Sequence, residues 1–306
     1  MRKNTNKTAV RKQRNRQRRA DLQALSFLLP SLLPYTVFLI IPIFATLRLS
    51  LYSWNGIKSS PQHFVGLQNY AKLFQNSTFL TSLGNSCCFV LATLLFIMPV
   101  SFLLAYILYK RLKFSGFFKT VFYLPSILPI AATGLMWCLM MALRGGVINA
   151  ILTALHLPAQ DWLGNTKIAI WAIVFVHAWL NIGQNMLIFL AGLTSVPDEL
   201  LDAAAIDGAV GLRKLLYVVI PSMLQSFKVF LVTGISTCFK VFAIIYIMTG
   251  GGPGNATANL PMMLYDYAFS RYQMGYASAI AMVLFALILL INLIQMSLER
   301  FVSYDA

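Results

Sequence analysis

The stretch SVPDELLDAAAIDGAVGLRKLLYVVIP, residues 195–221, is a polar segment inside an otherwise strongly apolar chain. Its first four residues, Ser195–Asp198, have the Ser-x-x-acid form of a capping box, with Pro197 in the first turn, where its missing N–H has no cost. Asp207-Gly208 interrupts the Ala-rich run that follows, because glycine adopts a positive φ easily and lets the chain reverse. A second short helical run extends to Pro221. The stretch therefore predicts two short helices joined by a glycine turn.

The composition indicates a membrane protein. With 58% hydrophobic residues, 11% charged residues and a mean hydropathy of +0.72, the chain of 306 residues is too apolar for a soluble domain. A helix of about 20 apolar residues crosses a hydrocarbon core ~30 Å thick. No apolar segment alternates as a β-barrel strand would, so the predicted fold class is all-α, a polytopic membrane protein. Six transmembrane helices are expected near Leu25–Leu49, Leu83–Tyr109, Phe117–Leu143, Ile168–Leu193, Met223–Met248 and Gly275–Leu298.

The positive charges predict the orientation of these helices. Nine of the 24 lysines and arginines precede Leu25, and others follow the second helix and flank residues 195–221. By the positive-inside rule, both termini and the 195–221 loop are cytoplasmic, in a multi-pass protein of a bacterial-type cytoplasmic membrane. The chain divides into a basic tail (1–24), a six-helix membrane domain (25–298) and a short cytoplasmic tail (299–306). We expect the basic tail to contact anionic lipid, and no nucleic-acid partner, since no nucleic-acid-binding module accompanies it.

Catalytic and metal-binding patterns are absent from the sequence. The four cysteines and three histidines have no ligand-set spacing, and the chain has no H-E-x-x-H, G-x-S-x-G or Walker A pattern. We therefore expect a chain that is not an enzyme and that carries no metal and no cofactor of its own.

Several motifs occur in a fixed order along the chain. They are FVGLQNY (64–70), FYLP (122–125), LIFLAG (187–192), TGGGP (249–253) and GYASA (275–279). Together with residues 195–221 they resemble the permeases of binding-protein-dependent ABC importers, in the sugar branch with the maltose-F-like and glycerol-phosphate-A-like subunits. The 195–221 stretch is similar to the EAA loop of that family, which reads roughly E-A-A-x-x-D-G-A and then I-x-L-P. Asp202 stands where the family has glutamate, and the leucine before Pro221 is missing.

The resemblance implies a set of partners. It implies a cytoplasmic coupling helix at Leu200–Ile206, in the loop between helices four and five, a second permease subunit forming a heterodimer, two ATPase subunits and an external solute-binding protein. ATP and Mg would then belong to the ATPase subunits, since this chain has no phosphate-binding loop of its own. The alternative is an ordinary interfacial loop whose acids are merely solvated. The residues expected to contact the ATPases are Asp198, Glu199, Asp202, Ala203, Ala204, Asp207, Gly208 and Ala209.

Polar residues inside the spans predict the substrate path, because such groups are costly in lipid and usually face the bundle or a cavity. His177, Asn181 and Gln184 share one helix face. Amides and hydroxyls beside aromatic rings suit a sugar, whose hydroxyls need polar partners and whose apolar face stacks on rings. The alternative is that these groups form hydrogen bonds between neighbouring helices and do not contact the solute. The expected path residues are Asn181, Gln184, Thr237, Phe239 and Lys240, on the two helices to which the resemblance also points.

Three interpretations of Lys240 stay open: its side chain snorkels to the interface, pairs with an acid of the other permease, or contacts an anionic solute.

The predicted function is that of a permease subunit of an ATP-driven carbohydrate importer, with an oligosaccharide as the solute. The same machinery for a glycerol phosphodiester or another solute is the first alternative. An ion-coupled secondary transporter is the second; it would require an ionisable relay or inverted repeats. Pro125 and Pro129 predict a bend in the third span.

Overall fold

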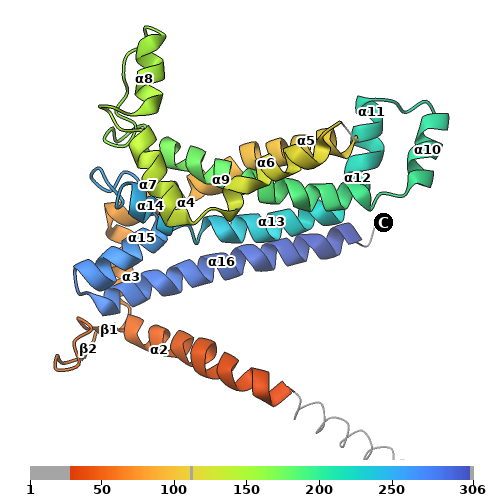
Figure 1. The fold of residues 1–306 in the computed structure, drawn as a ribbon. Helices are drawn as coiled ribbons and strands as arrows, with labels where there is room; N and C mark the ends of the chain where they lie inside the picture. Colours follow the sequence, from red (N-terminus) through yellow and green to blue (C-terminus); the bar gives the residue numbers. More distant parts are fainter. Residues whose placement is uncertain (1–27, 111–112, 304–306) are drawn as a thin grey trace, which may run out of the picture.

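The computed structural model describes residues 28–110 and 113–303 as an almost entirely helical chain (Figure 1). Five-residue π-helical turns, labelled η, interrupt several of the helices. In chain order the elements are η1 (Thr36–Ile40), α2 (Ile41–Ser50), β1 (Tyr52–Ser53), β2 (His63–Phe64), α3 (Gln68–Gln75), α4 (Ser77–Ala92), η2 (Thr93–Ile97), α5 (Met98–Tyr109), α6 (Ser115–Ile127), α7 (Ile130–Met140), α8 (Val147–Ala154), α9 (Ala169–Thr194), α10 (Asp198–Ile206), α11 (Leu212–Lys214), η3 (Leu215–Val219), α12 (Ile220–Ser222), α13 (Leu224–Cys238), α14 (Ala243–Met248), α15 (Leu260–Tyr265), η4 (Asp266–Ser270) and α16 (Met274–Ser303).

The described residues contain four to six candidate membrane spans. Four helical segments are long and apolar enough to cross a membrane: Leu28–Ser50, Ser77–Tyr109, Ala169–Thr194 and Met274–Ser297. Two further spans arise only if bent helix pairs are each counted as one. The predicted basic tail, 1–24, lies outside the described residues, and α16 continues to Ser303, past the predicted boundary at residue 298.

The bend predicted in the third span is confirmed. Helices α6 and α7 meet at 96°, with the break at Leu128 and Pro129. Leu128 has an extended backbone (φ −66°, ψ 139°), as expected for a residue that precedes proline, whose ring disfavours the helical conformation there. Pro125 lies one turn earlier, inside α6. The sharp turn therefore follows from the prolines in the sequence.

The fifth span is not the unbroken helix Met223–Met248 that the sequence predicts. Helix α13 ends at Cys238, and α14 begins only at Ala243. Between them, the side-chain amide of Asn259 donates to the backbone carbonyl of Val241. This bond comes from a distant segment and satisfies a carbonyl at the break, so the chain can leave the helix there without an orphaned polar group. At its other end, α13 meets Leu212–Ser222 at 66°.

Three buried apolar clusters hold the bundle together, and α9 contributes to two of them. The first joins Phe89 of α4 to Ile173 of α9 and Ile244 of α14. The second joins α5, α9 and α13 through residues such as Phe189 and Phe230. The third packs α3 and α15 against α16. Helix α9 therefore lies at the centre, with α5 and α6 on one side and α13 on the other (Figure 1).

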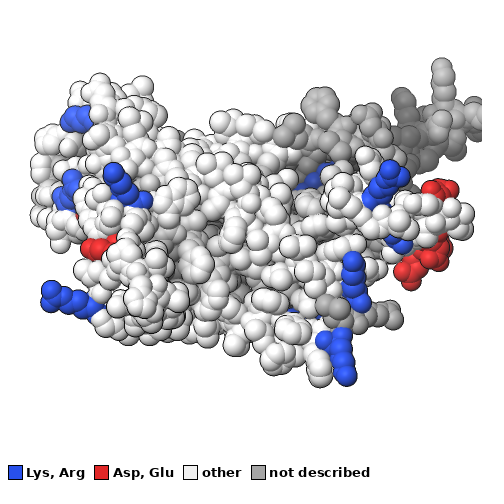
Figure 2. All heavy atoms as spheres, turned by 90° about the horizontal axis from the view of Figure 1, so that it is seen from above, with Lys and Arg blue, Asp and Glu red and all other residues white. Residues whose placement is uncertain are grey.

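The two ends of the bundle differ from its middle. Helix α10 lies at one end, and α8, α3 and the antiparallel pair β1–β2 lie at the other, while α2 leaves the bundle at an angle (Figure 1). In Figure 2 charged side chains gather at the two ends, and the central part of the visible face is largely free of them. An apolar belt between charged ends is the surface that a bilayer requires.

Candidate functional site

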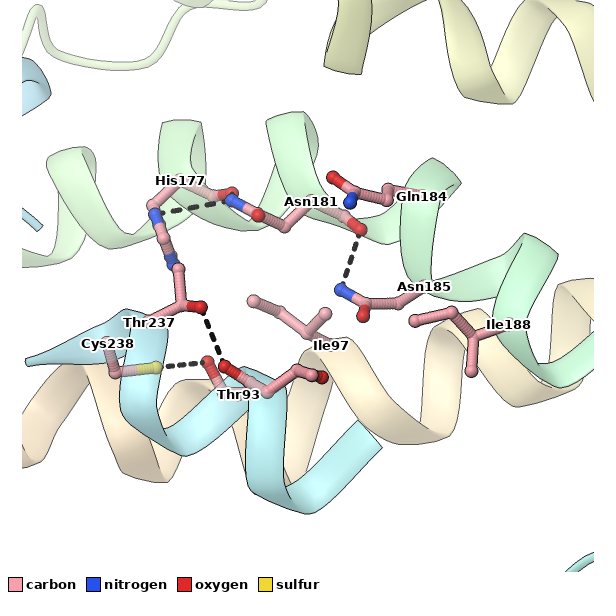
Figure 3. Close-up of a pocket in the computed structure, with 11 residues that line it drawn as sticks. Thr93, Ile97, His177, Asn181, Gln184, Asn185, Ile188, Thr237 and Cys238 are labelled. Atoms are coloured by element: carbon pink, nitrogen blue, oxygen red, sulfur yellow. Dashed lines mark hydrogen bonds between the residues drawn. The ribbon is translucent and has the colours of Figure 1, made fainter. Parts of the chain in front are cut away.

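Two adjoining cavities lie between α9 and α13, and Figure 3 shows the lining of the smaller one. Their volumes are about 180 and 300 Å³. Four residues line both: His177, Asn181, Gln184 and Thr237. The smaller cavity is also lined by Thr93, Asn185 and Thr233, and the larger one by Ser126, Lys240 and Phe242. We call the pair the central pocket.

The side chains of the central pocket differ in how far they are already hydrogen-bonded. The Asn181 amide donates to the His177 carbonyl at 2.7 Å, and the Asn185 amide donates to the Asn181 carbonyl at 2.9 Å (Figure 3). The Thr237 hydroxyl donates to the Thr233 carbonyl at 2.6 Å. Gln184 is exposed, and its amide makes no hydrogen bond within the part of the chain that the structure describes. Its donors and acceptor are therefore free for a ligand.

The ionisable side chains of the central pocket lie in different settings. His177 is buried and meets the ring of Phe89 edge-on, with 5.3 Å between the centroids. Lys240 is exposed on the wall of the larger cavity. Among residues 28–110 and 113–297, the ion pair that forms is Arg271–Asp266, so Lys240 has no carboxylate partner there. The pocket thus offers one cation and several neutral polar groups.

Four of the five predicted path residues come together in this pocket: Asn181, Gln184, Thr237 and Lys240. Phe239 does not line either cavity; it is only 4% exposed, at the end of α13. Phe242, at the other end of the four-residue break between α13 and α14, lies in the lining instead. Thr93 was missed: its hydroxyl contacts Cys238 at 3.0 Å. A threonine inside an apolar span was the signal available for it.

The two short helices predicted for residues 195–221 are present, but the first begins differently. Helix α10 starts at Asp198 with Pro197 as its N-cap, and no side chain caps it. The Ser195 hydroxyl instead donates to the Ala191 carbonyl at 2.9 Å, within the last turn of α9. The predicted capping box is therefore wrong, because α9 extends to Thr194 and keeps Ser195 at its own end.

The glycine turn after α10 is confirmed. Gly208 has φ +77°, and its N–H donates to the Ala205 carbonyl at 3.1 Å. The N–H of Ala209 donates to the Ala204 carbonyl at 2.8 Å. These two bonds form a Schellman motif, which satisfies the free carbonyls at the end of a helix and places glycine in the left-handed region. Gly208 thus fixes the direction in which the chain leaves α10.

The exposed face of α10 is acidic. Asp198, Glu199, Asp202 and Asp207 are all exposed, and Figure 2 shows acidic side chains together at the end that carries α10. Ala203 and Gly208 are exposed and Ala209 is half-buried, whereas Ala204 is only 7% exposed because it faces its own chain. The partly buried Leu201 and the buried Val196 belong to the second apolar cluster and attach α10 to the bundle.

Helix α9 links the central pocket to α10. Ten residues separate Gln184 from Thr194, the last residue of α9, which corresponds to about 15 Å along a helix. A Cβ at Gly192 would overlap Ser226 of α13, so the glycine lets α9 and α13 approach closely between the pocket and α10. Helices α9 and α13 are therefore closely packed in the segment between the pocket and α10.

Residues 97–304 match the family model described as the binding-protein-dependent transport system inner membrane component. This chain belongs to that family. The match spans α9, α10 and α13 and therefore includes the acidic helix and every lining residue named for the pocket except Thr93. The motif resemblance found in the sequence is thus confirmed at the level of the family.

Curated relatives cover nearly the whole chain. The probable ABC transporter permease protein YurN of Bacillus subtilis is 34% identical over 274 residues, covering 88% of this chain and 93% of the relative. The arabinooligosaccharides transport system permease protein AraP of the same organism is 34% identical and covers 89% and 87%. The trehalose/maltose transport system permease protein MalF of Thermococcus litoralis is 34% identical and covers 90% and 92%.

A solved structure shares the fold. A chain of the bacterial alginate ABC transporter, in complex with an alginate pentasaccharide-bound periplasmic protein, superposes with a TM-score of 0.82. It covers 94% of this chain and 97% of its own length at 20% sequence identity. The chain therefore has the fold of an ABC transporter permease.

Proposed function

We propose that this chain is one of two permease subunits of an ATP-driven importer and that it translocates an oligosaccharide delivered by an external binding protein. The observation that carries the proposal is the central pocket, where Gln184, Thr237 and the aromatic Phe242 line the same cavity. Amide and hydroxyl groups suit sugar hydroxyls, and an aromatic ring suits the apolar face of the sugar. Relatives named for arabinooligosaccharides and for trehalose and maltose support the same solute class.

The topology proposed for this function has six spans, each bent helix pair counting as one. Both termini and α10 then lie on the cytoplasmic side of the membrane, as the distribution of lysine and arginine favours. The six-helix domain is 25–298, and the flanking basic tail contacts anionic lipid. The exposed, apolar helix Leu28–Ser50 faces lipid and the second permease.

Helix α10 is proposed to be the coupling helix, in the loop between the fourth and fifth spans. Its exposed carboxylates at Asp198, Glu199 and Asp202 would meet the ATPase subunits, which bind ATP and Mg and perform the hydrolysis. Ala203 allows a close backbone approach, and Gly208 sets the angle of the turn. Because Val196 and Leu201 join α10 to the apolar cluster around α9 and α13, movement of α10 would reach the pocket walls.

A second candidate solute is anionic. Lys240 lines the larger cavity without a carboxylate partner among the described residues, and a phosphodiester or another acidic solute would supply one. The neutral amides and hydroxyls around it outnumber this one cation, so an uncharged oligosaccharide remains the principal proposal.

Reconstitution tests the proposed function. The complex of this chain with its second permease and two ATPase copies is placed in liposomes, and a panel of radiolabelled oligosaccharides is offered with the binding protein. We expect uptake of at least one sugar and ATP hydrolysis that the loaded binding protein stimulates. Uptake by this chain alone, with neither ATP nor binding protein, would contradict the proposal.

A further inference from the structure

Four aromatic side chains from two separate segments form a continuous row next to the central pocket. Phe242 stacks on Tyr246 with 5.4 Å between ring centroids, and Tyr246 meets Tyr265 edge-on at 5.1 Å. Phe242 also contacts Tyr265 at 5.2 Å, and Tyr265 contacts Phe269 at 5.2 Å. Tyr246 belongs to α14, Tyr265 ends α15, and Phe269 lies in η4. The sequence separates the two pairs by eighteen residues, so only the fold brings them together.

The row has one end at the pocket and the other at a polar edge of the molecule. Phe242 lines the larger cavity together with Lys240. In the sequence, Phe269 stands between Asp266 and Arg271, whose side chains form an ion pair at 2.7 Å and are 33% and 46% exposed, respectively. An exposed ion pair belongs at the aqueous boundary rather than in hydrocarbon. Helices α14 and α15 also lie at the end of the bundle away from α10 (Figure 1).

Two of the four rings are well exposed. Phe269 is 57% exposed and Tyr246 is 46% exposed, while Phe242 and Tyr265 are partly buried. Rings that pack against one another hold each other in place, and the exposed ones keep surface available for a further apolar partner. A row of exposed and partly exposed aromatic rings that starts at a polar boundary and ends beside amides and hydroxyls matches a ligand with both apolar faces and hydroxyl edges.

We propose that Phe269, Tyr265, Tyr246 and Phe242 form an aromatic track along which an oligosaccharide passes from the outer face into the central pocket. The sugar rings stack on successive aromatic rings while the hydroxyls stay hydrated, so no strong polar contact has to break at each step. This inference rests on the proposed function and specifies its solute. The track favours extended oligosaccharides, because a chain of several units contacts several rings at once whereas a single sugar contacts one.

The test uses the reconstituted complex and a labelled series of one sugar type, from monosaccharide to pentasaccharide. The series is chosen as a sugar that the wild-type complex takes up. The variants are Tyr246→Leu and Phe269→Leu, which keep apolar volume but remove the ring. Tyr246→Phe keeps the ring. Phe74→Leu is the matched control, because Phe74 lies on α3 at the same end of the bundle, outside the track, and is 58% exposed.

We expect each leucine variant to lower the uptake rate of the pentasaccharide about fivefold and that of the monosaccharide less than twofold, as the loss of one stacking contact implies. Tyr246→Phe and Phe74→Leu should both stay near wild type. Equal loss for all chain lengths, or loss in Phe74→Leu of the same size, would overturn the track. So would failure of the leucine variants to co-purify with the second permease, since the row would then be a subunit contact.

Failure of the proposed function gives a different result from failure of the track. If the wild-type complex takes up no sugar of the panel, the sugar proposal itself fails. If the wild type takes up sugar and the leucine variants match it at every chain length, only the track fails.

Discussion

The side chain of Asn259 connects the break in the fifth span to the start of α15. Its amide donates to the Val241 carbonyl, and its own carbonyl accepts from the N–H of Met262 at 3.1 Å, capping α15. Asn259 is fully buried. One residue therefore holds open the break that places Lys240 and Phe242 at the pocket, and also places α15 beside α14.

Asn259→Ala should lower both stability and transport. The change removes two hydrogen bonds and leaves the Val241 carbonyl buried without its partner, which costs about 1–3 kcal/mol. We expect a lower thermal denaturation temperature of the purified complex and reduced sugar uptake. Gln62→Ala is the control and should change neither, because Gln62 is exposed and its side chain makes no hydrogen bond within the described part of the chain. A wild-type melting temperature for Asn259→Ala would show that the break does not depend on this side chain.

Gly208→Leu should uncouple ATP hydrolysis from transport. A side chain at φ +77° costs about 1 kcal/mol or more and changes the angle at which the chain leaves α10. Insertion into the membrane should persist, since the spans are untouched. The measurement is uptake per ATP hydrolysed in proteoliposomes. Gly145→Leu is the matched control, because Gly145 has φ +78° and equally open surroundings but lies next to α8. If Gly145→Leu lowered uptake per ATP hydrolysed as much as Gly208→Leu, a coupling role of Gly208 would be contradicted.

Comparing substitutions at Gln184 and Gln295 distinguishes a side chain that contacts the solute from one that connects two helices. Gln295 on α16 donates to the Leu231 carbonyl of α13 at 3.1 Å, whereas Gln184 has no such bond in the described part of the chain. Gln184→Ala should therefore reduce sugar uptake about three- to tenfold with an unchanged melting temperature. Gln295→Ala should reduce the free energy of unfolding by roughly the 0.6 kcal/mol typical of such bonds, and so lower the melting temperature. The opposite pattern would assign Gln184 to helix packing.

Lys240→Met distinguishes the two candidate solute classes. Methionine keeps most of the length of the side chain and removes the charge. If the solute is a neutral oligosaccharide, we expect uptake within about twofold of wild type, because the lysine stem can snorkel without binding. The measurement is the uptake of labelled neutral sugar by wild type and by Lys240→Met, with and without a glycerol phosphodiester as competitor. Loss of transport confined to the anionic solute would favour the second candidate.

The apolar spans, the glycine turn at Gly208 and the bend at Pro129 could be predicted from the sequence, because each depends on local chemistry. The break after Cys238 could not, since it depends on Asn259, twenty-one residues further along the chain. Because the break was not predicted, Phe239 was expected in the pocket lining, where the structure has Phe242 instead. Ser195 was expected to cap α10, but the sequence pattern does not reveal that α9 continues to Thr194.

The pocket itself was partly predictable. His177, Asn181 and Gln184 have the spacing of one helix face, and polar residues inside an apolar helix indicate a lined cavity. The contribution of Thr93 depends on how η2 packs on α13, which no local pattern contains. The burial of Ala204 likewise follows from the side of α10 that meets the bundle.

In the proposed importer, ATP hydrolysis by subunits bound at α10 drives sugar through this chain. The most direct measurement is accumulation of labelled oligosaccharide in proteoliposomes that hold the complete complex, with binding protein and sugar on one side and ATP on the other. Ionophores remove every ion gradient. We expect accumulation to continue with ionophores present and to stop when ATP is omitted. Accumulation that requires an imposed ion gradient and proceeds without ATP would contradict this mechanism.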